Sequence, residues 1–441
     1  MRQMSKAMPK VVMLVANDVS IDGRVQKIAL SVSKFADVTV MGITRGPSLI
    51  THEEFGFRVM LFPAGSRNTS YLTKVRKYIG KSLIALNRRW TIPFLTRYGQ
   101  RITTQKIEDS SQVSAPNLPW RQVLLENKTY ATLINPVLTK IAPDVLHAHD
   151  VHLLSIAGEY AASNLNTHLI YDSHEYIRGL PTHTPEIRKA YAEVENEFIP
   201  GASAVITVSS AIAQRLKIDH SLKVLPTVIM NTPTLVSGEC EAGTGIREVI
   251  GLDVDIPLVV YSGGINLTRG IEIVIDALGY LPDVHFAATS NRFSWYTEQL
   301  QERAENAGAK GRLHFVPYVA PEKISQYLSS ADLGISPLPA NVVNYDLALP
   351  NKLFDYIQAG LPVAVSNCKE QQSLIEELEV GLAYQWNDPK DCARAIESLL
   401  KSHDVLVKRY DEMSTELTKY LWPAQEEKLT NLYRSLLDFE K

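Results

Sequence analysis

The sequence KVVMLVA-NDVSIDGR-VQKIALSVSKFA-DVTVMGI, residues 10–43, decides the fold class. Its first and last parts are continuous apolar runs, which are typical of strands buried on both faces of a parallel sheet. The part between them is expected to be a loop followed by a helix, with Asp22, Gly23 and Arg24 where the helix begins. The loop lacks the G-x-G-x-x-G pattern, so it carries no dinucleotide fingerprint. The stretch therefore predicts a β-α-β unit.

Strands continue to alternate with helices on both sides of a polar, turn-rich segment, NTPTLVSGECEAGTG at 231–245. This alternation is typical of doubly wound α/β domains, and the segment is a suitable boundary between two of them. We expect a Rossmann-like N-terminal domain over residues 1–231 and a second Rossmann-like domain over 232–420. A C-terminal helix over 421–441 is expected to pack back across the boundary.

Length and composition fit a soluble protein with two cores. The chain has 441 residues, of which 45% are hydrophobic and 21% charged, and this balance is ordinary for globular proteins. Its three cysteines are far apart, so neither a disulfide framework nor a metal cluster is suggested. No apolar window approaches the ~18 residues that a spanning helix needs, and the first apolar run is too short for a signal-peptide core. We therefore expect a cytoplasmic protein.

Positive charge is concentrated between Glu54 and Glu108, where eleven lysines and arginines occur and no acid does. As a helix, the segment within 65–118 would carry an apolar face opposite a basic one, which favours contact with an anionic membrane surface. The residues expected to make that contact are Lys74, Lys77, Lys81, Arg88 and Trp90. The alternative is that the apolar face packs on the protein's own core. No nucleic-acid-binding module is recognisable there. We expect peripheral attachment to the cytoplasmic face of the inner membrane.

Polar residues follow two strands of the first domain, in HAHD (147–150) and DSHE (172–175). Ligands of open α/β sheets bind beyond the carboxyl ends of the strands. Histidines there can contact a sugar hydroxyl or exchange a proton near neutral pH. A zinc site is less favoured, because no third ligand stands at a typical spacing, and the histidines could also be purely structural. The candidate catalytic residues are His147, His149, His174 and Glu175.

Two further motifs lie in the second domain, SGGINLTRG (262–270) and PNKLFD (350–355). Gly263 and Gly264 allow close approach of the backbone to a phosphate, and Arg269 can reach a diphosphate oxygen. PNKLFD places Asn351 and Lys352 at the start of a helix, where free N–H groups attract anions. Asp355 can accept hydrogen bonds from a diol such as ribose. Together the motifs predict a site for a nucleotide.

Six segments in this order resemble the family 4 glycosyltransferases. They are DGRVQKIALSV, PDVLHAHD, YDSHE, AVITVSS, YSGGINLTRGIE and PNKLFDYIQAGLPV. The resemblance covers roughly residues 10–62 and 119–437 and leaves out the basic segment. It implies a retaining enzyme of GT-B architecture, with two Rossmann-like doubly wound domains facing each other across a cleft.

The resemblance also implies roles for individual residues. The first domain, residues 1–231, would be the acceptor side of the enzyme. The second domain would bind a nucleotide-diphosphate sugar, with Arg269 and Lys352 on the diphosphate and Asp355 on the ribose. Backbone N–H groups of Asn351, Lys352 and Leu353 would assist, Gly23 would lie under the phosphate across the cleft, and a histidine of HAHD would contact the sugar. The sequence departs from the family at Leu347, where the first of two glutamates is usual, and its nearby acid is Asp346.

The implied function is transfer of a hexose-type sugar, with retention, to a glycan or lipid-linked acceptor in cell-surface polysaccharide biosynthesis. The nucleotide-diphosphate sugar would be the co-substrate, with no cofactor and no bound metal. Two alternatives are a nucleotide-sugar epimerase of the same fold and a non-catalytic partner with a decayed site. Base, sugar, acceptor and linkage are left open.

Overall fold

The computed structural model describes residues 8–54, 56–64, 119–234, 245–290 and 294–437. The five residues expected to contact a membrane, Lys74, Lys77, Lys81, Arg88 and Trp90, lie outside the described residues. None of the helices in the described ranges combines the length and the apolar character needed to cross a bilayer.

The first domain is built on an eight-stranded sheet in the order β3-β4-β2-β1-β5-β6-β7-β8. Its strands are β1 (Lys10–Leu14), β2 (Asp37–Thr44), β3 (Ile50–Glu54), β4 (Phe57–Pro63), β5 (Val145–His149), β6 (His168–Ser173), β7 (Ala204–Thr207) and β8 (Thr227–Val228). Its helices are α1 (Gly23–Ser33), α4 (Trp120–Val123), α5 (Leu125–Ile141), α6 (Leu154–Ser163), α7 (Pro185–Phe198) and α8 (Ser210–Asp219). All neighbouring strands are parallel except β3, an edge strand antiparallel to β4 that the sequence did not suggest because it is short and polar.

The second domain has a six-stranded, fully parallel sheet in the order β11-β10-β9-β12-β13-β14. Its strands are β9 (Leu258–Tyr261), β10 (His285–Thr289), β11 (Leu313–Val316), β12 (Leu333–Ser336), β13 (Val363–Ser366) and β14 (Gly381–Tyr384). Its helices are α9 (Ile246–Ile250), α10 (Ile271–Ala277), α11 (Trp295–Asn306), α12 (Ile324–Leu328), α13 (Val343–Leu347), α14 (Asn351–Gln358), α15 (Lys369–Leu378), α16 (Pro389–Lys401), α17 (His403–Glu412) and α18 (Ser414–Leu417). The predicted pair of doubly wound α/β domains is confirmed.

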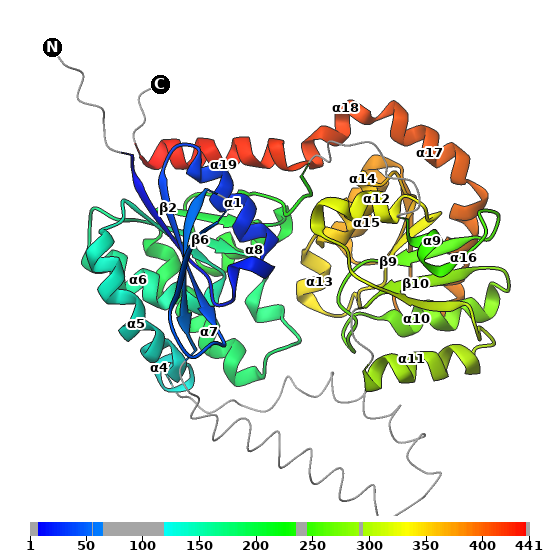
Figure 1. Cartoon of the computed structure of the whole chain (residues 1–441), viewed down its shortest axis with the longest axis horizontal. Coiled ribbons are helices and arrows are strands. Elements are labelled where there is room, and N and C mark those ends of the chain that lie inside the picture. The colour runs from blue at the N-terminus through cyan, green and yellow to red at the C-terminus, as the bar shows by residue number, and fades with distance from the viewer. Residues whose placement is uncertain (1–7, 55, 65–118, 235–244, 291–293, 438–441) are drawn as a thin grey trace, which may run out of the picture.

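The last helix, α19 (Trp422–Leu436), returns to the first domain and lies along α1 (Figure 1). Trp422, Leu429 and Tyr433 belong to the same buried apolar cluster as Val11 and Met13 of β1. Burying each such side chain contributes about 1.5–3 kcal/mol. The helix is therefore part of the first domain's core.

The chain passes between the domains at two places, after β8 and again before α19. These two crossing segments are in contact. The backbone N–H of Trp422 donates to the carbonyl of Pro233 at 2.9 Å, and the indole of Trp422 donates to the hydroxyl of Ser31 at 3.1 Å. The start of α19 is therefore bound both to Pro233 and to α1.

The domains also meet away from the crossings, where α13 lies against η4 (Ile177–Gly179). The N–H of Tyr176 donates to Asn344 Oδ1 at 2.7 Å, and Ser209 Oγ donates to the carbonyl of Leu347 at 2.5 Å. Gly179 permits this approach, since a Cβ there would lie 2.7 Å from the nitrogen of Asn344. The cleft between the domains is thus bounded by contacts on two sides.

Candidate functional site between the domains

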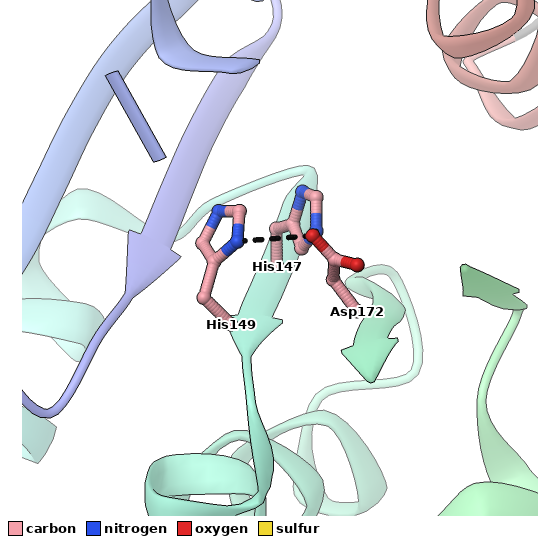
Figure 2. A group of neighbouring side chains, drawn as sticks. All are labelled: His147, His149 and Asp172. Atoms are coloured by element: carbon pink, nitrogen blue, oxygen red, sulfur yellow. Dashed lines mark ion pairs between the residues drawn. The ribbon is translucent and has the colours of Figure 1, made fainter. Parts of the chain in front are cut away.

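Strand pairing brings HAHD and DSHE together at one edge of the first sheet. β5 and β6 are parallel neighbours, with His149 opposite Asp172. His147 and His149 alternate along β5, so they lie on one face, and their rings stack with centroids 4.1 Å apart. His149 Nδ1 is 3.3 Å from Asp172 Oδ2, and the dashed line in Figure 2 marks this pair. The two motifs therefore form one cluster centred on Asp172.

Arg24 binds both carboxylate oxygens of Asp172 and stabilises the ionised form. Its Nε donates to Oδ2 at 2.9 Å and its Nη2 to Oδ1 at 2.7 Å, while Nη1 donates to the carbonyl of Ile229 at 2.9 Å. Burial alone would raise the pKa of Asp172, but Arg24, and then His174 and His149, hold it well below its usual range. The carboxylate is therefore ionised and fixed in place.

His147 lies behind the other histidines and lines neither of the two cavities described below. Its Nδ1 is 2.8 Å from the hydroxyl of Tyr433 on α19. Burial, and then His149, lower the pKa of His147 well below its usual value, and burial keeps the Tyr433 hydroxyl protonated by raising its pKa. The tyrosine therefore donates to a neutral imidazole.

The pKa values of His149 and His174 are shifted in opposite directions. Burial lowers the pKa of His149, and its Nε2 has no hydrogen-bond partner among the described residues. Burial also acts to lower the pKa of His174, but Asp172, 3.3 Å from its Nε2, raises it. The neutral form of His149 and the cationic form of His174 are therefore favoured relative to a free imidazole.

Glu175 follows His174 and lines the same interdomain cavity. Its pKa is raised by burial and by the carboxylate of Asp150, while Arg269 acts to lower it. A carboxyl group with a raised pKa beside a cation is a suitable proton donor or acceptor near neutrality.

In the second domain, the glycine turn and α14 form one unit. The N–H of Ser262 donates to the hydroxyl of Tyr356 at 2.8 Å, and Lys352 Nζ donates to the hydroxyl of Tyr261 at 3.3 Å. Gly263 has φ +143°, and a Cβ there would lie 3.1 Å from Cε of Lys352. Glycine is therefore required here both by the backbone conformation and by the lysine beside it.

Helix α14 buries Leu353, Phe354, Tyr356 and Ile357, and presents its first turn toward the cleft. Pro350 precedes it without a side-chain cap, and the N–H of Leu353 already donates to the carbonyl of Pro350 at 3.1 Å. The N–H groups of Asn351 and Lys352 remain at the helix start, where partial positive charge favours an anion.

Lys352 is buried, and Asp355, one turn further along α14, is half-buried. Burial, and then Arg269, lower the pKa of Lys352 to about 7, against the opposing effect of Asp355. Burial raises the pKa of Asp355 to about 7, although Lys27 and Lys352 act to lower it. Lys27 belongs to the first domain and donates to Asn231 Oδ1 at 2.9 Å, so charges from both domains meet at Asp355.

A cavity of about 360 Å³ lies between the domains. Of the residues proposed from the sequence, His174, Glu175, Arg269 and Asn351 line it. The remaining lining residues are Asp22, Arg24, Asp150, Val208, Asn231, Leu338, Asn344, Tyr345, Ala348, Leu349 and Pro350. Arg269 carries a buried Nε that has no partner among the described residues, and its guanidinium lies over the ring of Tyr345 at 5.6 Å. The cavity thus offers a hydrogen-bond donor for an anion.

Several proposed donor residues stand close to this cavity without lining it, namely Gly23, Gly263, Gly264, Lys352, Leu353 and Asp355. Gly23 opens α1 with nothing within 4 Å of its would-be Cβ. Asn344 and Tyr345 line the cavity although no sequence pattern marked them, and Asn231 comes from the crossing segment. Asp22 and Asp150 belong to stretches that the sequence did single out, although neither was among the candidate site residues.

At Leu347, where the resemblance departs, the structure shows an apolar contact. Leu347 and Ala348 pack against the main apolar cluster of the first domain. Asp346 faces away from the cleft and accepts from the N–H of Lys369 at 2.9 Å, with Lys369 Nζ 3.1 Å from its other oxygen. Asp346 therefore binds the first residue of α15, and it does not take the place of the glutamate that is usual in the family at the position of Leu347.

A smaller cavity of about 170 Å³ lies within the first domain. It is lined by Val15, Ala16, Asn17, Asp22, His149, Asp150, His152 and His174. Asp22, Asp150 and His174 line both cavities, so the two spaces adjoin.

One group of described side chains has metal-ligand geometry. Ligand atoms of His147, His149 and Asp172 lie within 4.8 Å of one another. However, Arg24 occupies both oxygens of Asp172, and its positive charge would oppose a cation there. The hydrogen bonds from Arg24 account for the ionised Asp172 of this group without a cation.

Comparison with known families gives two matches, one in each domain. Residues 83–229 match the model described as Glycosyltransferase Family 4. Residues 256–402 match the model described as Glycosyl transferases group 1. The first match begins inside the basic segment, which the motif-based resemblance had left out.

Among curated proteins, the chain is similar to D-inositol 3-phosphate glycosyltransferases. The protein from Xylanimonas cellulosilytica is 24% identical over 273 residues, which cover 58% of this chain and 63% of that protein. The protein from Corynebacterium jeikeium is 21% identical over 199 residues, covering 43% of this chain and 46% of that protein. The chain thus matches less than two thirds of the length of either relative.

Among solved structures, sucrose-phosphate synthase from Thermosynechococcus elongatus superposes with a TM-score of 0.71 at 16% identity, covering 98% of this chain and 100% of that one. Anabaena HepE in complex with UDP and glucose gives a TM-score of 0.66 at 16% identity, covering 97% and 100%. These likenesses concern the fold. Together with the two family matches, they show that the chain belongs to the family 4 glycosyltransferases of GT-B architecture.

Proposed function

We propose that this protein transfers a hexose-type sugar, with retention, from a nucleotide-diphosphate sugar to a glycan or lipid-linked acceptor in cell-surface polysaccharide biosynthesis. The observation that carries the proposal is the composition of the interdomain cavity. Arg269 and Asn351 of the second domain line it opposite His174 and Glu175 of the first. A site with anion donors on one side and proton-exchanging groups on the other suits group transfer from a diphosphate leaving group.

The donor would bind mainly to the second domain. The guanidinium of Arg269 and the first N–H groups of α14 would hold the diphosphate, and Lys352 would add a charge when the diphosphate binds. Asp355 would accept hydrogen bonds from the ribose hydroxyls. HepE, whose fold is similar, was solved with UDP and glucose, and this supports a UDP-sugar as the first donor to test.

In the transfer step the bond between the anomeric carbon and the diphosphate oxygen breaks, and a bond to the acceptor oxygen forms on the same face. The bonding electrons leave with the nucleotide diphosphate, whose growing charge Arg269, Lys352 and the start of α14 would stabilise. The proton of the acceptor hydroxyl would pass to the departing phosphate or to Glu175. Closure of the cleft would exclude water and limit donor hydrolysis.

The acceptor and the membrane form the second part of the proposal. The acid-free basic stretch between Glu54 and Glu108 supports attachment to an anionic surface, from which a lipid-linked acceptor could be reached. Flotation with anionic and with neutral liposomes tests this attachment. We expect the protein to bind anionic liposomes only, and less strongly as the salt concentration rises. If it binds neither kind of liposome, the membrane part of the proposal is wrong.

The donor part is tested by thermal unfolding with UDP-, GDP- and ADP-sugars, because a ligand that binds the native state raises its melting temperature. We expect one nucleotide class to raise it, and Lys352→Ala to reduce that shift and abolish transfer. Lys369→Ala is the matched control, since Lys369 is exposed and pairs with Asp346 outside the cleft. No shift with any nucleotide sugar would refute the proposal, while conversion of the donor without any acceptor would favour an epimerase.

A further inference from the structure

We propose that Lys27, on α1 of the first domain, is a positioning residue for the donor that binds the second domain. Its ammonium group holds the two crossing segments against α1 and keeps the carboxylate of Asp355 ready to accept the ribose hydroxyls. The inference rests on the proposed function, because it takes the donor to be a ribonucleotide. Lys27 belongs to the opposite domain from the donor and lines neither of the two cavities described above.

Lys27 contacts both segments that connect the domains. Its Nζ donates to Asn231 Oδ1 at 2.9 Å and to the carbonyl of Thr232, both in the first crossing segment. The same Nζ lies over the ring of Trp422 at the start of α19, 5.0 Å from the ring centroid. Two oxygen acceptors and an aromatic face together fix a cation in position. The ammonium group therefore has a defined place at the junction of the two domains.

Asp355 is turned toward the same junction from the second domain. Gln358 lies one turn further along α14, on the same face of the helix as Asp355. The Nε2 of Gln358 donates to the carbonyl of Thr234 at 2.8 Å, two residues along the crossing segment from the carbonyl that Lys27 binds. Helices α1 and α14 therefore meet at the first crossing segment, with Lys27 and Asp355 on the faces that are turned toward it.

The charge of Lys27 acts on Asp355 more strongly than the charge of Lys352, although Lys352 lies on the same helix as Asp355. Burial raises the pKa of Asp355 to about 7, and Lys27, followed by Lys352, acts to lower it. No hydrogen bond among the described residues reaches this carboxylate, so its oxygens are open to a ligand. Because an ionised carboxylate accepts stronger hydrogen bonds than a neutral carboxyl group, Lys27 favours the form that binds ribose hydroxyls best.

The other charged groups that act on Lys27 are bound elsewhere. Burial, and then Arg24, lower the pKa of Lys27 to about 7, whereas Asp355, and then Asp22, act to raise it. Arg24 is paired with Asp172, and the carboxylate of Asp22 caps the start of α1. Lys27 and Asp355 therefore stabilise each other's charged forms across the junction.

The first test compares UDP with 2′,3′-dideoxy-UDP, which has the same base and diphosphate but lacks both ribose hydroxyls. Calorimetry across pH 6 to 9 gives the ratio of the two affinities, from which the effect of Lys352 on the diphosphate cancels. In the wild type the ratio should rise as Asp355 ionises near pH 7. Lys27→Met should raise the pKa of Asp355, so that the ratio at pH 7 falls at least threefold and rises only at higher pH. If both affinities fall equally and the ratio keeps its pH profile, Lys27 has only a structural role and the proposal is wrong.

Two further variants test the cause. Lys34→Met is the matched control, because Lys34 lies at the end of α1 and pairs at the surface with Glu426 of α19, and it should leave the ratio unchanged. Asp355→Asn should make the ratio low and independent of pH, and adding Lys27→Met should then lower it no further. If Lys27→Met lowers the ratio equally with and without the carboxylate, the two residues are not coupled.

A measurement without nucleotide separates this inference from the proposed function. Carbon-13 NMR of labelled aspartate carboxyls follows the titration of Asp355, whose signal is assigned by its loss in Asp355→Asn. We expect Lys27→Met to raise the midpoint by about one pH unit, a tenfold change in proton affinity. If Lys27→Met does not fold, the coupling is measured in Asp355→Asn, where the midpoint of labelled Lys27 should fall. A midpoint that does not move would overturn the proposal, whereas failure of UDP to bind would contradict the proposed function alone.

Discussion

Arg24 and Asp172 form a buried two-fold hydrogen-bonded pair, with donor–acceptor distances of 2.9 and 2.7 Å, although 148 residues separate them in sequence. The side chains are 3% and 0% exposed. The pair joins the first turn of α1 to the end of β6 and fixes the carboxylate on which three histidines converge.

We therefore expect Arg24→Met to destabilise the protein strongly. Removing one partner leaves a buried, uncompensated carboxylate, at a cost of about 3–5 kcal/mol. Urea unfolding of the purified variant measures the change. Arg178→Met, at a partly exposed arginine 3.8 Å from Asp219, is the control, with an expected loss under about 1 kcal/mol. If Arg24→Met lowers the free energy of unfolding no more than the control does, the Arg24–Asp172 pair does not stabilise the site.

Gly263 offers a test of how Lys352 is placed. Alanine there would strain a backbone at φ +143° and bring its Cβ to 3.1 Å from Cε of Lys352. We expect Gly263→Ala to weaken UDP binding at least tenfold in calorimetric titration. Gly201→Ala, where nothing lies within 4 Å of the added carbon, should bind UDP normally. Equal affinity in both variants would contradict the role given to the glycine turn.

Binding of the donor should take up a proton above pH 7. The pKa of Lys352 is about 7, lowered by burial and by Arg269, and a bound diphosphate would raise it again. Below pH 7 the lysine is already protonated, so no uptake is expected there. As pH rises from 7 toward the pKa of the complex, the complex holds more protons than the free protein, and the UDP affinity should fall by up to tenfold per unit.

Calorimetry at pH 8 in two buffers of different ionisation enthalpy measures this uptake directly. Lys352→Met should bind more weakly, without the proton uptake and without the decline in affinity above pH 7. If the wild-type affinity stays constant between pH 7 and 9, Lys352 does not change its charge when the nucleotide binds.

Tyr433 should affect the site from a distance. Tyr433→Phe keeps the ring in the core and removes the hydroxyl that lies 2.8 Å from His147 Nδ1. A buried acceptor left unsatisfied costs about 1–3 kcal/mol, so we expect a modest loss of stability and a lower kcat with little change in the KM of the donor. Tyr420→Phe, whose hydroxyl lies 3.4 Å from the exposed Glu377 at the surface of the second domain, is the control. Unchanged kcat would limit Tyr433 to packing.

The sequence predicted those parts of the fold that depend on local patterns. Continuous apolar runs marked most strands, and the residues after β5 and β6 could be placed at one edge because parallel strands end together. The start of α14 could be predicted within one residue because Pro350 and Gly360 bracket it. The edge strand β3 was missed, since its short polar sequence has no apolar pattern.

The contacts that complete the site could not be predicted, because they join residues far apart in the chain. His147 meets Tyr433 across 286 positions, and Tyr176 meets Asn344 across 168. No local sequence pattern indicates which residues so far apart in the chain come into contact. Among the histidines, only geometry separates His147, which faces α19, from His149, which lines the smaller cavity.

The return of α19 to the first domain has a consequence for biosynthesis. The segment that carries Trp422, Leu429 and Tyr433 leaves the ribosome after the whole second domain has emerged. Domains generally fold as they are synthesised. Here, however, the first domain is synthesised first but can complete its folding only after the second domain and α19 have been made. Until that helix arrives, the nascent first domain exposes an apolar face beside β1 and α1, and His147 lacks its tyrosine. A ribosome stalled before residue 422 would thus display a finished second domain attached to an unfinished first one, a species that chaperones would be expected to bind.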